Sequence, residues 1–410
     1  MGSQDTNVPK SVYVVAFTSS LAGGFYWPYI SIYAVEIEAS FFEIGLVSSI
    51  SNAAPTVFQP IWGTLSDRML RRVIFVVLGH ILGGLIVLLF TRAHDPFTYT
   101  LLVALSMISL SAVTPAWSSY IGSFFKREER GRGIGRITGI GVLGNVLGAG
   151  VSGAIMTMLI GEHKIAQYTF TFSIAGILLI LTGLIALSLK EQKQNVNQFL
   201  RDKKNLSLRN SLSQNYLFRR LCLVEAFWWF TLSFAWPMYS AAYIIKLHAT
   251  KLEIAICSMI FNATFAVSQM SLGYLADKYG RRTILLTMRY IFPIYPLIWY
   301  IAQDVEFVYL ANFIVGIANA LASVAVMSYI LDITKEEERA SYFAIYNMVM
   351  GISQFIGSLS GGFLGDIISR NTNPMYAIQM IFLISIIIRI ASAIPYYFIE
   401  ETLAIGKLSS

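Results

Sequence analysis

Twelve apolar stretches, each long enough to cross a lipid bilayer, follow one another along this chain. A helix of about 20 residues spans roughly 30 Å of hydrocarbon at about 1.5 Å per residue. Lipid leaves no backbone group a water partner, and the alternating pattern of barrel strands is absent, so we expect every stretch to be a helix. The stretches are residues 11–34, 43–63, 72–92, 97–124, 134–160, 165–189, 219–246, 252–275, 283–302, 306–331, 340–367 and 375–399.

The distribution of charge agrees with a membrane protein. Only 13% of the 410 residues are charged and 56% are hydrophobic, whereas soluble chains average about 25% charged. Of the 30 Lys and Arg residues, 23 lie on the side of the two termini and five in the opposite loops. Basic loops stay in the cytoplasm, so we expect a multi-pass cell-membrane protein with both termini cytoplasmic. The net charge of +7 then reflects topology and not nucleic-acid binding.

A polar, glycine-free linker at residues 190–218 divides the spans into six plus six. We therefore expect an all-α fold of two pseudo-symmetric six-helix bundles. The N-terminal bundle takes residues 1–189, the C-terminal bundle residues 219–400, and a cytoplasmic tail residues 401–410.

The two halves are internal repeats. Residues of the first span recur 209 positions later: Phe25, Trp27, Pro28 and Ser31 correspond to Phe234, Trp236, Pro237 and Ser240. Part of the loop after the second span recurs 210 positions later: Gly63, Asp67, Arg71 and Arg72 correspond to Gly273, Asp277, Arg281 and Arg282. Agreement at separate places indicates one six-helix module used twice.

These repeated loops carry the chain's most specific motif. They read GTLSDRMLRR at residues 63–72 and GYLADKYGRR at residues 273–282. The pattern resembles the signature of the major facilitator superfamily of transporters, from which the first copy departs at Leu70. The REERGRG and EEERASY segments, residues 127–133 and 336–342, resemble the family's corresponding later loops. The resemblance covers about the whole chain and implies two bundles that rock about a central site.

We call residues 63–72 and 273–282 the latch loops, because the family arrangement implies contacts that hold the cytoplasmic side shut. It would place Asp67 near Ala340 and Asp277 near Gly131, each facing the positive end of a helix. The alternative is that the charges only keep these loops from crossing the membrane. The candidate latch residues are Gly63, Asp67, Arg71, Arg72, Arg130, Gly273, Asp277, Arg281, Arg282 and Arg339.

The candidate substrate cavity is aromatic and polar but nearly uncharged. Tryptophan stands beside proline in the middle of the first and seventh spans, and proline lets a helix bend. Such a surface suits amphipathic, neutral or cationic compounds, and sugars equally. For each amide, packing between helices is the alternative. The candidates are Tyr26, Trp27, Tyr29, Asn52, Asn145, Trp229, Trp236, Tyr239, Asn262, Asn319 and Asn347.

Four ionisable residues lie clearly inside spans: His80, Glu225, Arg289 and Arg389. Glu225 is the only acid among them. Ionisable residues in spans are functional candidates, so Glu225 is our candidate for proton coupling. The alternative is a structural ion pair with Arg289. Arg389 is interpreted as structural and His80 as a packing residue.

The glycine run at residues 139–155 resembles the family's drug-antiporter motif, with Asn145 and Ala149 replacing a proline and a glycine. Close helix packing is an equal alternative. The sequence thus favours a secondary active transporter over an enzyme. It contains no nucleotide-binding motif, and we expect no cofactor or metal site. We expect a monomer that exports small amphipathic compounds in exchange for protons. The alternatives are import or uniport of a sugar or organic solute, and a non-transporting receptor on the same fold.

Overall fold

The computed structural model describes residues 8–69, 71–125, 130–159, 164–191, 215–335 and 338–403. Every element in these ranges is helical, and all twelve predicted stretches contain helix. Ten helical segments among the described residues are long and apolar enough to cross a membrane. The other two predicted stretches are the first, which is interrupted, and the second, which is the continuous helix α3 (Phe41–Met69).

The chain forms two compact units. Unit 1 comprises Met1–Ala39, Ile50–Gln194 and Thr250–Met259. Unit 2 comprises Ser40–Ser49, Asn195–Ala249 and Ile260–Ser410. The units follow the two halves of the sequence except that the first turns of the second and eighth spans belong to the unit of the other half.

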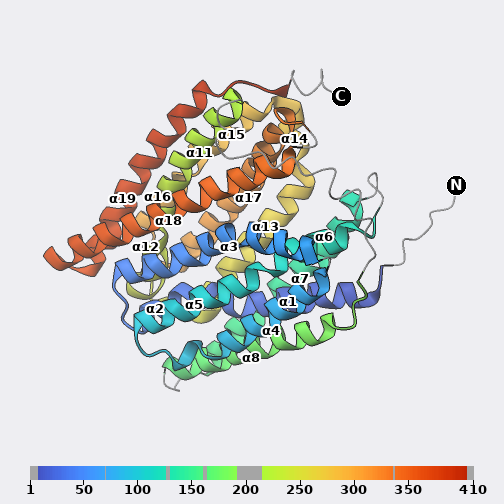
Figure 1. Ribbon diagram of the computed structural model, residues 1–410. Helices are drawn as coiled ribbons and strands as arrows, with labels where there is room; N and C mark the ends of the chain where they lie inside the picture. Colours follow the sequence, from blue (N-terminus) through green and yellow to red (C-terminus); the bar gives the residue numbers. More distant parts are fainter. Residues whose placement is uncertain are drawn as a thin grey trace. The chain divides into compact units, whose positions relative to one another are not determined.

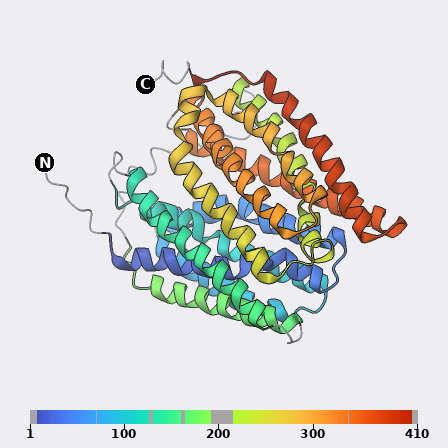
Figure 2. The ribbon, with the colours of Figure 1, turned by 180° about the vertical axis from the view of Figure 1, so that it is seen from behind.

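Unit 1 is built mainly from the first six spans. Its α1 packs along α7 and α8, and α4 packs along α8 (Figures 1 and 2). Its elements are α1 (Lys10–Tyr26), η1 (Trp27–Tyr29), α2 (Ile30–Glu36), most of α3, α4 (Arg72–Leu88), η2 (Phe90–Arg92), α5 (Pro96–Ser111), α6 (Val113–Gly122), α7 (Arg130–Met158) and α8 (Lys164–Ala186).

Unit 2 is built mainly from the last six spans. Its α11 packs against α18 and α19, and α15 packs against α17 (Figure 1). Its elements are α11 (Tyr216–Ser233), α12 (Trp236–Ile245), most of α13 (Lys251–Leu272), α14 (Tyr274–Tyr279), α15 (Arg281–Ile291), α16 (Ile294–Ile301), α17 (Val305–Asp332), α18 (Arg339–Asn371), α19 (Pro374–Ala393) and η3 (Ile394–Phe398).

The same glycine contact holds the equivalent helix pair in each unit. A Cβ atom at Gly148 on α7 would lie 2.2 Å from the carbonyl oxygen of Leu21 on α1. A Cβ atom at Gly357 on α18 would lie 2.2 Å from the carbonyl oxygen of Phe230 on α11. Both partners are related by the 209-residue offset, so the repeat seen in the sequence is also a repeat of helix packing. The glycine run of α7 therefore serves close packing, whatever further role it has.

Candidate functional site

The first span is interrupted at the aromatic segment that the sequence singled out. Pro28 has no backbone N–H and lies in the short turn η1, between α1 and α2. Trp27 is 43% exposed and its ring stacks on Tyr26 with 5.8 Å between centroids. Tyr26 and Tyr29 are buried, and the Tyr29 hydroxyl donates to the carbonyl oxygen of Lys251 at 3.3 Å. Of these three candidates, only Trp27 offers a substantial surface to a ligand.

The seventh span is interrupted at the equivalent place. Here α11 ends at Ser233 and α12 begins at Trp236, which is followed by Pro237. Trp236 is half-buried. Tyr239, by contrast, stacks its ring on Phe382 of α19 at 5.2 Å, within the aromatic packing of unit 2. Trp236 is therefore the better ligand candidate of the two.

The candidate amides are divided between the units. Asn52 and Asn347 are exposed, whereas Asn145, Asn262 and Asn319 are half-buried. Asn145 donates to the carbonyl oxygen of Ser20 at 3.4 Å, across the α1–α7 contact. This hydrogen bond supports the interpretation that Asn145 serves packing between helices.

Glu225 is fully buried in unit 2 and forms the ion pair with Arg289 that the sequence offered as the alternative. Its Oε1 lies 2.7 Å from the Arg289 Nη2 and accepts from the Tyr396 hydroxyl at 2.6 Å. Its Oε2 accepts from the Tyr346 hydroxyl at 3.0 Å and from the Trp229 indole nitrogen at 3.1 Å. A buried carboxylate is tolerated when it is paired and hydrogen-bonded, and this one has four donors from four helical elements.

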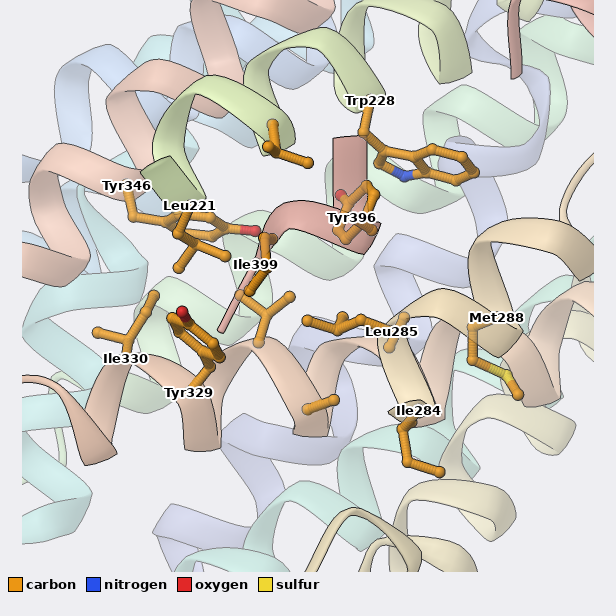
Figure 3. Packing of buried hydrophobic residues seen from close by; sticks show 14 of the residues in the cluster. Leu221, Trp228, Ile284, Leu285, Met288, Tyr329, Ile330, Tyr346, Tyr396 and Ile399 are labelled. Atoms are coloured by element: carbon orange, nitrogen blue, oxygen red, sulfur yellow. The ribbon is translucent and has the colours of Figure 1, made fainter. Parts of the chain in front are cut away.

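Aromatic rings surround the cation of this pair. The Arg289 guanidinium carbon lies 4.4 Å from the centre of the Trp228 ring and 5.0 Å from that of Tyr396. Trp228, Tyr346 and Tyr396 belong to the packed core of unit 2 (Figure 3). The sequence missed the two tyrosine donors, because they lie 121 and 171 residues from Glu225 and tyrosine is common in this chain.

In the second latch loop, Arg281 is the centre of the charge contacts. Its Nη1 lies 2.9 Å from Asp277, whose side chain is 70% exposed, and its Nε lies 2.9 Å from Asp332 at the end of α17. Its Nη1 also donates to the carbonyl oxygen of Ala276 at 2.9 Å. The buried Arg281 thus ties the loop to α17 within unit 2.

A glutamate after the last span caps the helix that follows this loop. The Glu401 carboxylate accepts from the backbone N–H groups of Arg281 at 2.9 Å and Arg282 at 3.1 Å, at the start of α15. Gly280 is needed here, because its φ is +94° and a Cβ atom would lie 2.3 Å from the carboxylate. In unit 1, Glu191 accepts from the N–H of Val73 at the start of α4, at 2.6 Å.

Sequence reasoning missed this pair of caps although the signal was present. Glu191 and Glu401 are 210 residues apart, which is the offset that relates the two latch loops. A carboxylate at a helix N-terminus accepts otherwise unpaired N–H groups and faces the positive end of the helix dipole.

The remaining latch candidates have separate partners. The side chains of Asp67 and Arg130, and those near Gly131 and Ala340, lie outside the described residues.

Gly63 lies beside Pro115, and Arg71 precedes α4 as its N-cap residue. A Cβ atom at Gly273 would lie 3.0 Å from the carbonyl oxygen of Gln269. Three arginines donate to carbonyl oxygens: Arg72 to Ser119 at 3.1 Å, Arg282 to Tyr397 at 2.5 Å and Arg339 to Leu331 at 3.3 Å.

We expect Glu401→Ala to lower the free energy of unfolding by about 1 kcal/mol, because it removes the cap from two N–H groups of α15. The matched control is Glu400→Ala. The Glu400 side chain is 55% exposed and lies 3.6 Å from Arg220, and such surface pairs contribute little. Thermal unfolding in detergent measures both, and equal shifts in the two variants would contradict the capping role.

Comparison with known proteins gives matches along the whole chain. The family described as Major Facilitator Superfamily matches residues 12–245 and 221–409. An uncharacterized MFS-type transporter of Methanocaldococcus jannaschii is 26% identical over 96% of this chain and 98% of its own length. A multi-drug resistance efflux pump homolog of Lactococcus lactis is 25% identical over 79% of each chain. A crystal structure of a bacterial homolog of the human lysosomal transporter Spinster has a TM-score of 0.76, at 15% identity, and covers 97% of this chain and 98% of that one.

Proposed function

Because the chain belongs to the Major Facilitator Superfamily and is a multi-pass secondary transporter, we propose that it exports small amphipathic compounds in exchange for protons. The observation that carries this proposal is the pair of interrupted spans. Trp27 is 43% exposed directly before Pro28, and the half-buried Trp236 stands at the equivalent place before Pro237. Flat aromatic rings at two bends suit ligands with extended apolar or cationic surfaces.

The charges of unit 2 support a neutral or cationic substrate over an anionic one. Arg289 is buried against Glu225, and Arg389 is buried among backbone carbonyl groups. Neither guanidinium is therefore available to an anion without breaking contacts inside the unit. The similarity to an efflux pump homolog over 79% of the chain supports export.

The second candidate is import or uniport of a sugar or another polar organic solute. Exposed amides on two spans, Asn52 and Asn347, favour it, because amides can bond hydroxyl groups in pairs. Trp27 and Trp236 would serve this substrate by stacking.

For the mechanism, we propose alternating access with the latch loops as the cytoplasmic gate. Arg281 connects Asp277 to Asp332. Asp277 is 70% exposed, and an ion pair with so exposed a partner can separate at modest cost. Protonation of Glu225 would remove the charge that faces Arg289 and loosen the link between α11 and α15. The protein would act as a monomer in the cell membrane with both termini in the cytoplasm.

Transport into proteoliposomes tests the proposal. A panel of amphipathic cations, neutral amphipathic compounds, sugars and nucleosides is offered with and without an imposed pH gradient. We expect the pH gradient to drive accumulation of amphipathic compounds. Accumulation of only sugars or nucleosides would favour the second candidate, and transport indifferent to the pH gradient would contradict proton coupling.

Removing Trp27 or Trp236 should weaken substrate binding. We expect Trp27→Ala and Trp236→Ala each to cost about 2 kcal/mol in binding free energy, because buried aromatic contacts dominate such sites. The control is Trp62→Phe, since Trp62 packs against the buried core of unit 1 and its indole N–H donates to the carbonyl oxygen of Ile108. The affinity of each variant is measured by equilibrium binding of an identified substrate. Wild-type affinity in both alanine variants would mean that the substrate site lies elsewhere.

A further inference from the structure

Arg389 is a buried cation near the C-terminal end of α19 that has no acidic partner among the described residues. It is 1% exposed. Its Nη2 donates to the carbonyl oxygen of Leu232 at 2.9 Å and to the Tyr239 hydroxyl at 3.0 Å. Its Nη1 donates to the carbonyl oxygen of Phe292 at 3.3 Å. An arginine cannot lose its proton in a protein, so its charge must be offset by these groups.

Both carbonyl groups lie where a helix is interrupted. Leu232 is in the last turn of α11, and the seventh span resumes only at Trp236. Phe292 follows the last residue of α15, and the ninth span resumes as α16 at Ile294. Pro296, four residues after Phe292, has no N–H to donate to that carbonyl. The carbonyl accepts instead from the N–H of Tyr295 at 3.1 Å, so Arg389 is its second donor. Arg389 supplies a donor at both interruptions.

The electrostatics of this arrangement are complementary. The C-terminal end of a helix acts as about half a negative charge, so two ends together offset about one positive charge. A guanidinium alone in a span is costly. The two carbonyl oxygens and the Tyr239 hydroxyl supply acceptors for it, so Arg389 is tolerated in a span without a carboxylate.

The contacts of Arg389 bracket the candidate substrate residue Trp236. Leu232 lies four residues before Trp236, and Tyr239 lies three residues after it. The Tyr239 ring is also fixed by Phe382 of α19, at 5.2 Å between centroids. The bend is therefore tied to α19 on both sides of the tryptophan.

We infer that Arg389 is a positioning residue, which holds the interruption of the seventh span in place and thereby sets the position of the Trp236 ring for substrate. The second half of this inference rests on the proposed function, in which Trp236 contacts substrate. The first half, that Arg389 holds the interruptions of the seventh and ninth spans, is independent of any substrate.

Hydrogen exchange of the purified full-length protein tests the first half. In Arg389→Met, backbone exchange should rise by about tenfold or more in residues 230–240 and 288–297, as expected when charge-assisted hydrogen bonds are lost. Arg389→Lys keeps the charge without the planar fork and should give a smaller rise. Ser385→Ala is the matched control, because Ser385 is buried one turn earlier on α19 and its hydroxyl forms no hydrogen bond with either carbonyl. Unchanged exchange at both interruptions in folded Arg389→Met would overturn the inference.

Tyr239→Phe keeps the test valid if Arg389→Met does not fold. This variant removes one acceptor and leaves both carbonyl contacts, so exchange should rise in residues 236–240 and stay unchanged in residues 288–297. Wild-type exchange in both segments would count against the inference.

Binding of an identified substrate tests the second half. Arg389→Met should weaken affinity by about tenfold, and Ser385→Ala should leave it unchanged. Raised exchange with wild-type affinity would overturn the role in positioning Trp236. A wild-type protein that transports no amphipathic compound would instead contradict the proposed function, and the exchange result would stand.

Discussion

Replacing Arg289 with methionine should lower the free energy of unfolding by about 3 to 5 kcal/mol, because it leaves a buried carboxylate without its cation. Glu225 is fully buried, and its shortest contact to a cation is the 2.7 Å contact with Arg289. The tyrosine hydroxyls and the indole N–H would remain, but neutral donors compensate a buried charge only in part. Thermal unfolding in detergent, followed by circular dichroism, measures the loss.

The double variant Glu225→Leu/Arg289→Met is the control for this prediction. Apolar replacement of both partners of a buried pair is often nearly neutral, so the double variant should be more stable than Arg289→Met alone. If the double variant were as unstable as the two single variants together, the two residues would act independently. The 2.7 Å contact would then contribute no coupling energy.

Gradient-driven transport should be abolished by Glu225→Gln, whereas exchange of labelled for unlabelled substrate should continue. An amide cannot take up and release a proton in the working range of pH, but exchange requires no net proton movement. Glutamine also keeps the shape of the side chain and one acceptor oxygen for Tyr396 or Tyr346. Both activities are measured in the same proteoliposomes, so that loss of folded protein lowers them together.

The matched control is Glu253→Gln, which alters an acid in the first turn of α13 that accepts from the N–H of Thr250 at 2.7 Å. We expect it to leave gradient-driven transport and exchange unchanged. Gradient-driven transport that survives Glu225→Gln would remove Glu225 from the coupling mechanism. Loss of exchange as well, in protein that remains folded, would show that the pair with Arg289 is needed for the conformational change itself.

The ion pair of Glu225 was predictable for a physical reason, and its other partners were not. A charge inside a span needs an opposite charge, and Glu225 and Arg289 are a few residues inside the same side of their spans. Tyr346 and Tyr396 carry no such requirement, because a neutral hydroxyl can find partners in many places. Which of the 22 tyrosines reach Glu225 depends on how α18 and η3 pack against α11.

The partners of Arg389 could not be predicted from the sequence either. The sequence interpretation gave Arg389 a structural role, but the sequence contains no acid placed to pair with it. Its partners are carbonyl groups of α11 and of the α15–α16 break, and a backbone carbonyl has no signature in the sequence. Tyr239 was likewise grouped with Trp236 by proximity along the chain, although its ring packs on Phe382.

The sequence by itself determined the helical class, the spans and the repeat, because the hydrophobic requirement of lipid acts on every residue of a span and the duplication preserved residue spacing. It also singled out Pro28 and Pro237 as places where a helix can bend, since proline removes a backbone donor. Proline alone does not decide this, because Pro55 and Pro60 lie inside the continuous helix α3. Only the tertiary structure decided the other contacts across helices: the two tyrosine hydroxyls at Glu225, the carbonyl groups around Arg389 and the caps by Glu191 and Glu401. These contacts join residues far apart in the chain, and the packing of one helix on another selects among many chemically equivalent partners.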